Sequence, residues 1–355
     1  AGNVGFKALA IACGLARSRR PRTRASSVDD RDLPRYTVLV PAFGEANVIG
    51  ELIAHLGALD YPADRLEVLL LLEECDRETI DAARAARMPA SVRIVVVPDG
   101  QPRTKPKACN VGLGFAHGEL LVIYDAEDRP EPDQLRKAVA AFRAAPPEVV
   151  CLQARLNYHN ADENLLTRFF TLEYSHWFDL MLEGLSALRL PLPLGGTSNH
   201  FRTAALRELG GWDPHNVTED ADLGLRAAAR GLRVATLDST TYEEACCRTW
   251  PWIRQRTRWI KGYMQTALVH TRQPASFVRH AGLRASLTLL LLVAGTPLAF
   301  LAAPVLWAVM LVGLARGRGP GLAAGSVEQD VAVANLVVGN SLLVLVSAVA
   351  ALRRR

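Results

Sequence analysis

The chain has 355 residues, half of them hydrophobic, and a formal net charge of +5 at pH 7. This length and apolar content allow one large domain or two ordinary ones with a sizeable core. The six cysteines show neither CxxC spacing nor a paired histidine, which argues against a zinc site and against a disulfide framework. Much of the excess positive charge lies in arginine-rich flanks, so the charge says little about a substrate.

Residues 1–30 predict a partial membrane segment followed by a basic linker. The stretch 1–16, AGNVGFKALAIACGLA, is too short and too polar to span a bilayer alone, and we interpret it as the end of a longer helix. Five arginines between residues 17 and 24 then favour a contact with anionic lipid headgroups. A nucleic-acid site is the weaker interpretation, because no recognition module or interleaved aromatic residues accompany these arginines.

Residues 31–250 have the rhythm of a soluble α/β domain. Apolar runs that predict strands occur at 36–43, 66–72, 92–97 and 119–124, and they alternate with helical patterns near 46–59, 77–88, 104–117 and 132–144. Apolar strands separated by helices predict a parallel sheet covered on both faces. Ligands of such sheets bind beyond the carboxyl ends of the strands, so the loops after these strands form the candidate site.

A cluster of acids follows the fourth predicted strand. The sequence YDAEDRP places Asp125, Glu127 and Asp128 where a short loop can bring two carboxylates to one hard cation. A loop of this kind with bound Mg²⁺ or Mn²⁺ can hold a diphosphate, which bare carboxylates would repel. A solvated acidic turn, stopped by two prolines, is the alternative, and the triplet alone does not decide between them.

A glycine-containing turn lies at 193–202, PLGGTSNHFR. Its glycines permit close approach of the backbone, and polar side chains follow on Thr197, Ser198, Asn199 and His200. The alternative to a binding role is a plain tight turn.

The sequence NVTEDADLGLR predicts a helix that runs through Arg230. Thr218 would be its N-cap, with Glu219 and Asp220 in the first turn. Capping alone would explain these residues, and the alternative is a catalytic role for the acids.

The segment 251–285 predicts helices at a membrane surface. Within WIRQRTRWIKGYMQT, residues Gln255, Arg258 and Trp259 stand at i, i+3 and i+4, on one helix face. An arginine and a tryptophan there can brace a diphosphate and a ring, and the alternative is a basic amphipathic helix on the bilayer.

Residues 286–355 predict a transmembrane region. The segments 286–315 and 331–352 are nearly free of charge and exceed the roughly 20 residues that a spanning helix needs. Pro297 and Pro304 permit one kinked span or a more broken arrangement. Only Arg316 and Arg318 lie in the connecting loop, so the positive-inside bias places the soluble domain in the cytosol.

In combination, these motifs resemble a known family. The order of acid loop, TED, QxxRW and membrane spans is similar to that of the processive family-2 glycosyltransferases, the group of bacterial cellulose synthase, hyaluronan synthase and poly-N-acetylglucosamine synthase. The phrases VPAFGEANVI (40–49), KPKACNVGL (105–113) and GGTSNHFR also resemble this family. The resemblance covers roughly residues 36–270, and the motifs are specific together although each is weak alone.

The resemblance implies an α/β fold, a GT-A nucleotide-sugar transferase domain on a mixed, mainly parallel sheet, joined to transmembrane helices. It implies donor contacts from Pro41, Ala42, Glu45, Glu74, Lys105, Lys107, Asp125, Gln255, Arg258 and Trp259. It implies acceptor contacts from Gly196, Thr197, Ser198, Asn199 and Trp259. The implied metal ligands are Asp125 and Glu127, with Asp128 in reserve, and Glu74 stands where the family more often has an Asp pair.

The resemblance also implies a reaction. A sugar would pass with inversion from a UDP-sugar to the end of a growing β-linked polysaccharide at the bacterial inner membrane, with Asp220 as general base beside Glu219 and Mg²⁺ or Mn²⁺ as cofactor. Expected partners are the UDP-sugar, the polysaccharide and the lipid bilayer. Two spans are few for an export channel, so either more helices lie beyond the termini of this sequence or the pore needs additional membrane or export subunits. The alternatives are a non-processive membrane transferase that adds one sugar to a lipid or surface glycan, and a non-catalytic membrane scaffold.

Overall fold

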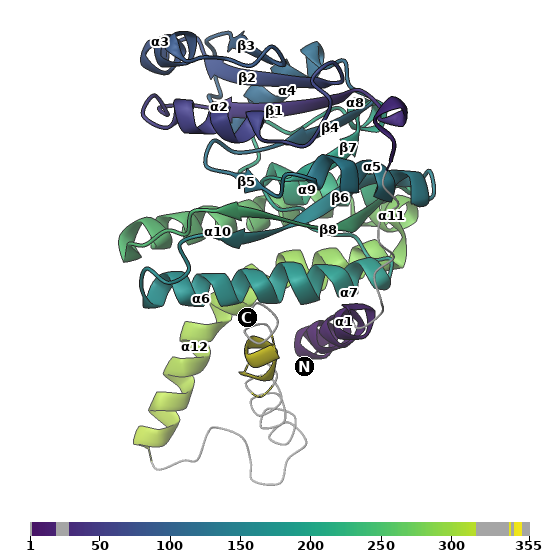
Figure 1. Ribbon diagram of the computed structural model, residues 1–355. Coiled ribbons are helices and arrows are strands. Elements are labelled where there is room, and N and C mark those ends of the chain that lie inside the picture. Colours follow the sequence, from purple (N-terminus) through teal and green to yellow (C-terminus); the bar gives the residue numbers. More distant parts are fainter. Residues whose placement is uncertain (1, 19–27, 317–340, 342–343, 350–355) are drawn as a thin grey trace.

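The computed structural model describes residues 2–18, 28–316, 341 and 344–349, and these residues are built around an eight-stranded sheet (Figure 1). The strand order is β3-β2-β1-β4-β7-β6-β8-β5. The strands are β1 (Tyr36–Ala42), β2 (Leu66–Glu73), β3 (Val92–Val97), β4 (Leu120–Ile123), β5 (Arg129–Pro130), β6 (Val149–Tyr158), β7 (Asn199–Arg202) and β8 (Arg233–Glu243). The first four predicted strands are therefore confirmed.

The sheet is parallel in its first half and mixed in its second. Strand β1 pairs in parallel with β2 and β4, and Tyr36 lies opposite both Leu66 and Leu120. Strand β7 is antiparallel to both β4 and β6, while β6 and β8 are parallel. The carboxyl ends of β1, β2, β3 and β4 consequently lie along one edge, where the predicted site loops begin.

Helices cover both faces of this sheet because alternate strand residues point to opposite sides. Val38 and Leu70 pack in one buried cluster with α2 (Ile49–Gly57), α3 (Arg77–Ala85) and α5 (Gln134–Ala144). Leu39 and Leu71 pack in the other with α4 (Lys105–Phe115), α7 (Leu182–Ala187), α8 (Thr203–Glu208) and α9 (Glu219–Ala229). The prediction of a sheet covered on both faces is confirmed.

A group of helices lies at the β6–β8 end of the sheet (Figure 1). It contains α6 (Leu165–Tyr174), the π-helix η2 (Ser175–Met181), α10 (Thr249–Thr271) and α11 (Pro274–Thr288), and α12 (Gly295–Ala315) leads away from it after a second π-helix, η3 (Leu289–Ala294). Helix α1 (Gly2–Ser18) packs against α7. Added methyl groups would lie 1.7 Å from the Ala10 carbonyl oxygen at Gly184 and 2.1 Å from the Leu180 carbonyl oxygen at Gly14, so these glycines allow the close packing.

One helical run among the described residues, Phe277–Ala302, is long and apolar enough to cross a membrane by length and composition alone. It starts earlier than the predicted span 286–315, and α12 continues to Ala315 with Pro304 inside it. The backbone breaks from helical geometry at Gly282, where φ is 77°. The arginines at 19–24 and most of the predicted span 331–352 lie outside the described residues.

Candidate active site

The acid loop after β4 uses its three acids differently. The Asp128 carboxylate is 3% exposed, and its Oδ2 accepts hydrogen bonds from the Asp125 backbone N–H (2.8 Å) and the Thr197 hydroxyl. Its Oδ1 has no hydrogen-bond partner among the described residues. Asp128 therefore shapes the loop from inside, while Asp125 is half-buried and Glu127 is exposed at the sheet edge.

Lys105, the first residue of α4, joins the acid loop to the glycine turn. Its Nζ donates to Asp125 Oδ1 and to the Gly196 carbonyl oxygen, the latter at 2.8 Å. Burial alone would lower the pKa of Lys105, but the Asp125 carboxylate outweighs burial and the pKa is raised. Lys105 consequently remains a cation beside the candidate metal ligand.

The polar side chains of the glycine turn point into the protein. The Thr197 hydroxyl also donates to the Ile123 carbonyl oxygen (3.1 Å), the Ser198 hydroxyl to Thr241 Oγ1 (2.7 Å) and the Asn199 amide to the Gly195 carbonyl oxygen (2.6 Å). All three residues are at most 1% exposed. Their predicted acceptor contacts stay a prediction, and these side chains hold the turn in place.

A buried polar network supports the glycine turn. The Tyr36 hydroxyl lies 2.7 Å from His200 Nδ1, and His200 Nε2 lies 3.1 Å from Gln134 Oε1. Burial lowers the pKa of His200 to about 3, so the ring is neutral and bonds through both nitrogens. The network links β1, β7 and α5. It therefore anchors β7, the strand that follows the glycine turn.

Glu219 and Asp220 stand at the start of α9, next to the acid loop and the turn. A methyl group added at Gly196 would lie 3.6 Å from Asp220 Oδ2 and 4.0 Å from Lys105 Nζ, so both charged groups lie beside the space that a side chain there would fill. Asp220 Oδ1 accepts from the Ala221 backbone N–H at 2.7 Å. Thr218 occupies the N-cap position as predicted, but its side chain makes no capping hydrogen bond.

Burial raises the pKa of both adjacent acids. Desolvation raises the pKa of Asp220 to about 6. Desolvation, reinforced by the neighbouring Asp220 carboxylate, raises the pKa of Glu219 to about 8. A carboxylate whose pKa is raised toward neutral pH is a stronger proton acceptor than an ordinary one, which suits this pair to general-base work.

The predicted Gln255, Arg258 and Trp259 lie on α10, as the spacing indicated. Trp259 packs beside Phe170 and Tyr174, with ring centroids 6.1 and 6.4 Å away. The Gln255 Oε1 atom is buried without a hydrogen-bond partner among the described residues, and Arg258 is exposed.

Sequence reasoning missed Arg256, the residue that supports Trp259. Its guanidinium carbon lies 4.6 Å from the Trp259 ring centroid and 4.5 Å from that of Phe170. The same guanidinium makes two 2.5 Å hydrogen bonds to Glu173 on α6. The i, i+3 spacing of Arg256 and Trp259 was the available signal, but Glu173 is too distant in sequence to be paired from it.

The predicted donor residues Pro41 and Ala42 are the last two residues of β1, and Glu45 lies in the loop that follows at the same edge of the sheet. This loop is held by α3, because Gly44 N–H donates to Asp76 Oδ2 (2.6 Å) and Glu45 N–H to Thr79 Oγ1 (3.1 Å). Asp76 also caps α3 by accepting from the Thr79 N–H. This double role of Asp76 was not predicted.

Glu74 follows β2, and Lys107 on α4 reaches the carboxyl ends of β2 and β3. Lys107 Nζ donates to Glu73 Oε2 (3.0 Å) and to the Pro98 and Gly100 carbonyl oxygens. Glu74 Oε2 accepts from the Asp99 backbone N–H at 3.3 Å. Lys107 therefore ties two strand ends together, and its predicted donor contact stays a prediction.

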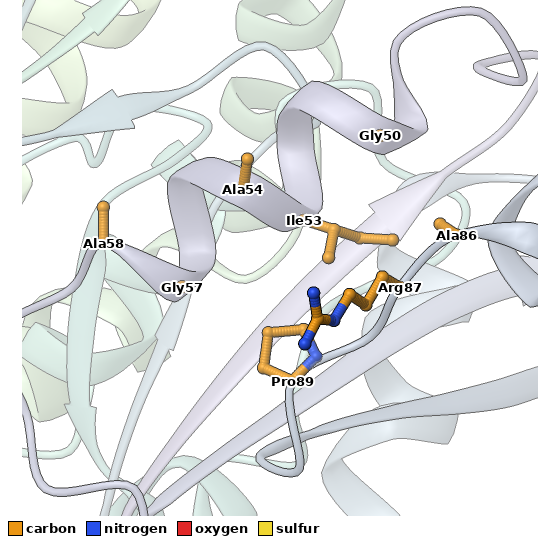
Figure 2. Close-up of a pocket in the computed structure, with 8 residues that line it drawn as sticks. All are labelled: Gly50, Ile53, Ala54, Gly57, Ala58, Ala86, Arg87 and Pro89. Carbon is orange, nitrogen blue, oxygen red and sulfur yellow. The ribbon is translucent and has the colours of Figure 1, made fainter.

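A cavity of about 530 Å³ lies elsewhere (Figure 2). It is lined by Gly50, Ile53, Ala54, Gly57, Ala58, Ala86, Arg87 and Pro89, between α2 and the segment after α3. None of the predicted site residues lines it, so we do not assign it to the site.

Comparison with solved structures identifies the fold. The mannosyltransferase PcManGT from Pyrobaculum calidifontis matches 99% of this chain and 97% of its own chain, with a TM-score of 0.57 and 23% identity. The domain accordingly has the GT-A glycosyltransferase fold with a mixed, mostly parallel sheet.

Comparison with sequences identifies the family. The probable glycosyltransferase YdaM of Bacillus subtilis is 27% identical over 67% of this chain and 57% of its own length. Glucomannan 4-beta-mannosyltransferase 2 of Arabidopsis thaliana is 30% identical over 66% of this chain and 46% of its own length, so the chain spans about half of these relatives. The model of the family described as "Glycosyltransferase like family 2" matches residues 34–262, and the chain belongs to this family.

Proposed function

We propose that this protein transfers a sugar from a nucleotide-sugar to the end of a β-linked glycan, with inversion at the sugar carbon. The observation that carries the proposal is that Asp220 and Lys105 both lie beside Gly196, and that Lys105 also holds Asp125. A base and a diphosphate-binding loop thus face one space beyond the sheet edge. A non-catalytic scaffold would not need an ionisable base in this position.

The transfer is a single displacement. The acceptor hydroxyl oxygen attacks C1 of the donor sugar, the bond from C1 to the diphosphate oxygen breaks, and its electron pair leaves with the nucleoside diphosphate. Asp220 takes the proton of the attacking hydroxyl, and its ionisation near neutral pH suits that role. Attack from the face opposite the nucleotide turns an α-linked donor into a β-linked product.

The residues of the acid loop fit a divalent cation that is shared with the donor. No group of three or more His, Cys, Asp or Glu side chains within the described ranges is arranged to hold a metal by itself. Mg²⁺ and Mn²⁺ are commonly held by one or two carboxylates together with water and substrate phosphates, and Asp125 and Glu127 supply two. The cation, when bound, neutralises charge on the leaving diphosphate.

The protein's own cations complete that neutralisation. Lys105 remains charged beside Asp125, and the exposed guanidinium of Arg258 is free to reach a diphosphate from α10. Trp259, held by Arg256 and the aromatic group on α6, offers a ring face to the acceptor sugar. These roles are part of the proposal.

The donor sugar is proposed from the relatives. Several are named glucomannan 4-beta-mannosyltransferases, and the solved structure of PcManGT contains GDP-Man and Mn²⁺. A mannosyl donor is thus a second candidate beside the UDP-sugar implied by the motifs. The long apolar helix run Phe277–Ala302 supports a membrane location, and the arginine-rich flanks of the sequence support a cytosolic domain at the inner membrane.

The reaction is tested with membranes that contain the full chain, Mg²⁺ or Mn²⁺, and a panel of UDP-sugars and GDP-mannose. We expect release of UDP or GDP from one donor, and we expect Asp220→Asn to lower kcat at least about 100-fold, the range of general-base contributions. Asp64→Asn is the matched control, because Asp64 is 81% exposed and only weakly paired with Arg65. Equal nucleotide release by wild type and Asp220→Asn would refute the catalytic role.

The size of the product separates two forms of the proposal. A processive synthase gives long, insoluble polymer from a labelled donor, whereas a non-processive transferase adds one sugar to a lipid or a surface glycan. The intact QxxRW set favours the polymer. Only single-sugar products on a gel would remove processivity and leave the transferase.

A further inference from the structure

The face of α10 that carries the QxxRW residues continues directly into a contact with α9. Gly262 and Thr266 follow Gln255 by 7 and 11 residues, which at 3.6 residues per turn places all three on one side of the helix. Gly262 is buried, and Thr266 is fully buried. The side of α10 that bears Gln255, Arg258 and Trp259 is therefore the side that docks on α9.

Gly262 meets Thr218 at the beginning of α9. A methyl group added at Gly262 would lie 2.4 Å from Thr218 Cγ2 and 2.6 Å from its Oγ1, far inside van der Waals contact. Only a residue without a side chain allows this approach. The contact also explains why Thr218 makes no capping hydrogen bond, since its side chain lies against α10 instead.

Polar contacts fix the two helices in this position. Asn216 Nδ2 donates to Thr266 Oγ1 at 3.0 Å, and Thr266 Oγ1 lies 3.4 Å from Thr218 Oγ1. About one helical turn further along both helices, His270 Nε2 lies 2.8 Å from Asp222 Oδ1. The side chains of Asp222 and His270 are 5% and 10% exposed, so water competes little for this bond.

Arginine 226 anchors the same carboxylate to the body of the domain. Its Nε donates to Asp222 Oδ2 at 2.7 Å, and its terminal nitrogens donate to the Leu209 and Gly211 carbonyl oxygens. Helix α10 is thus joined through Asp222 to the segment before α9, as well as to α9 itself.

We propose that the contact of Gly262 and Thr266 with Thr218 is a spacer that sets the separation between Asp220 and the QxxRW face. Asp220 is two residues beyond Thr218, and Trp259 is three residues before Gly262, roughly 4.5 Å along the helix axis. A shift of α10 against Thr218 therefore displaces the diphosphate- and acceptor-binding face relative to the base. Gly262 and Thr266 are positioning residues, and the inference rests on the proposed transferase function.

The first test is Gly262→Ala in membranes with the full chain, using the donor from which wild type releases nucleotide fastest. The added methyl must move α10 by about 1 Å, and a displacement of that size lowers kcat about 10- to 100-fold. The KM for the donor should change less than about threefold, since most donor contacts are at the sheet edge. Gly50→Ala is the matched control, because a methyl group at this helical glycine meets nothing within 4 Å.

The second test relieves the overlap between the methyl group added at Gly262 and the Thr218 side chain. Thr218→Ser removes Cγ2, the atom nearest to the added methyl, so Gly262→Ala combined with Thr218→Ser should regain part of the lost kcat. A kcat of Gly262→Ala within twofold of wild type, or a double variant no better than Gly262→Ala, would overturn the spacer. Absence of nucleotide release from wild type with every donor would instead overturn the transferase function.

Thr266 keeps the proposal testable if Gly262→Ala does not fold. Thr266→Ser retains the hydroxyl that accepts from Asn216, whereas Thr266→Val retains the shape and loses the hydroxyl. We expect Thr266→Ser to keep kcat near the wild-type value and Thr266→Val to lower it about tenfold with little change in donor KM. Equal kcat values for the two variants would overturn the positioning role.

Discussion

Asp220 and Glu219 are adjacent acids, and their surroundings raise the pKa of each. Burial raises the pKa of both, to about 6 for Asp220 and to about 8 for Glu219. A base acts only in its deprotonated form, so kcat should be half-maximal near pH 6, level off above about pH 7 and fall about tenfold per pH unit well below pH 6. Measurement of nucleotide release from pH 4.5 to pH 8 at saturating donor tests this directly.

The matched variant for the pH profile is Glu219→Gln. Because burial and the neighbouring Asp220 carboxylate favour the protonated form of Glu219, its replacement by a neutral amide should leave the acid limb of the profile in place. A limb centred near the ordinary aspartate pKa of about 3.9 would mean that burial does not tune Asp220.

Single residues also show where sequence reasoning stops. Asp125, Glu127 and Asp128 could be recognised as an acid loop from their spacing and their place after a strand. The different positions of the three acids could not be predicted. Asp128 is held in the interior by a hydrogen bond from Thr197, which is 69 residues away along the chain. Thr218 was placed correctly as an N-cap, but its partner Gly262 comes from another helix.

At the scale of elements, local pattern predicted most of the parallel half-sheet. Strands β1 to β4 are largely apolar and the helices between them are amphipathic, and both patterns can be recognised from a short stretch of sequence. The antiparallel insertion of β7 between β4 and β6 was not predicted, since pairing of strands distant in sequence leaves no local period. Such long-range pairing places the glycine turn beside the acid loop.

The packing of α1 on α7 is a testable property of elements. A methyl group at Gly184 would lie 1.7 Å from the Ala10 carbonyl oxygen, and backbone cannot yield as a side chain does. Gly184→Ala should therefore destabilise the protein by about 1–3 kcal/mol, as overpacked sites do. A lower melting temperature of the detergent-purified chain and faster tryptic cleavage at Arg17 would follow.

Gly5→Ala is the matched control for that experiment, because a methyl group at Gly5 meets nothing within 4 Å. It should keep or slightly raise the melting temperature, since alanine favours the helix over glycine by up to about 1 kcal/mol. Equal melting temperatures for Gly184→Ala and wild type would show that α1 does not depend on this contact.

At the scale of the whole molecule, α10 connects the candidate active site to the apolar helices. Its face docks on α9 beside Asp220, and it contacts α11, η3 and α12, which lead toward the apolar run. Insertion of that run into a bilayer would therefore hold the acceptor side of the site at the membrane surface. Leu298 (59% exposed) and Leu301 (61% exposed) on α12 are suitable positions for testing this membrane insertion.

Replacing both Leu298 and Leu301 by lysine places two charges on exposed positions of α12, each costing roughly 2.5–3.5 kcal/mol at the centre of a spanning helix. Wild type should remain with membranes after alkaline carbonate extraction, whereas the double variant should be released or degraded. Val96→Lys is the control, because Val96 is 40% exposed on β3, at the opposite edge of the sheet from α12. Release of wild type by carbonate would contradict membrane insertion. It would leave the transferase chemistry open to its own test, because the groups assigned to that chemistry lie on α4, α9, α10 and the loop after β4.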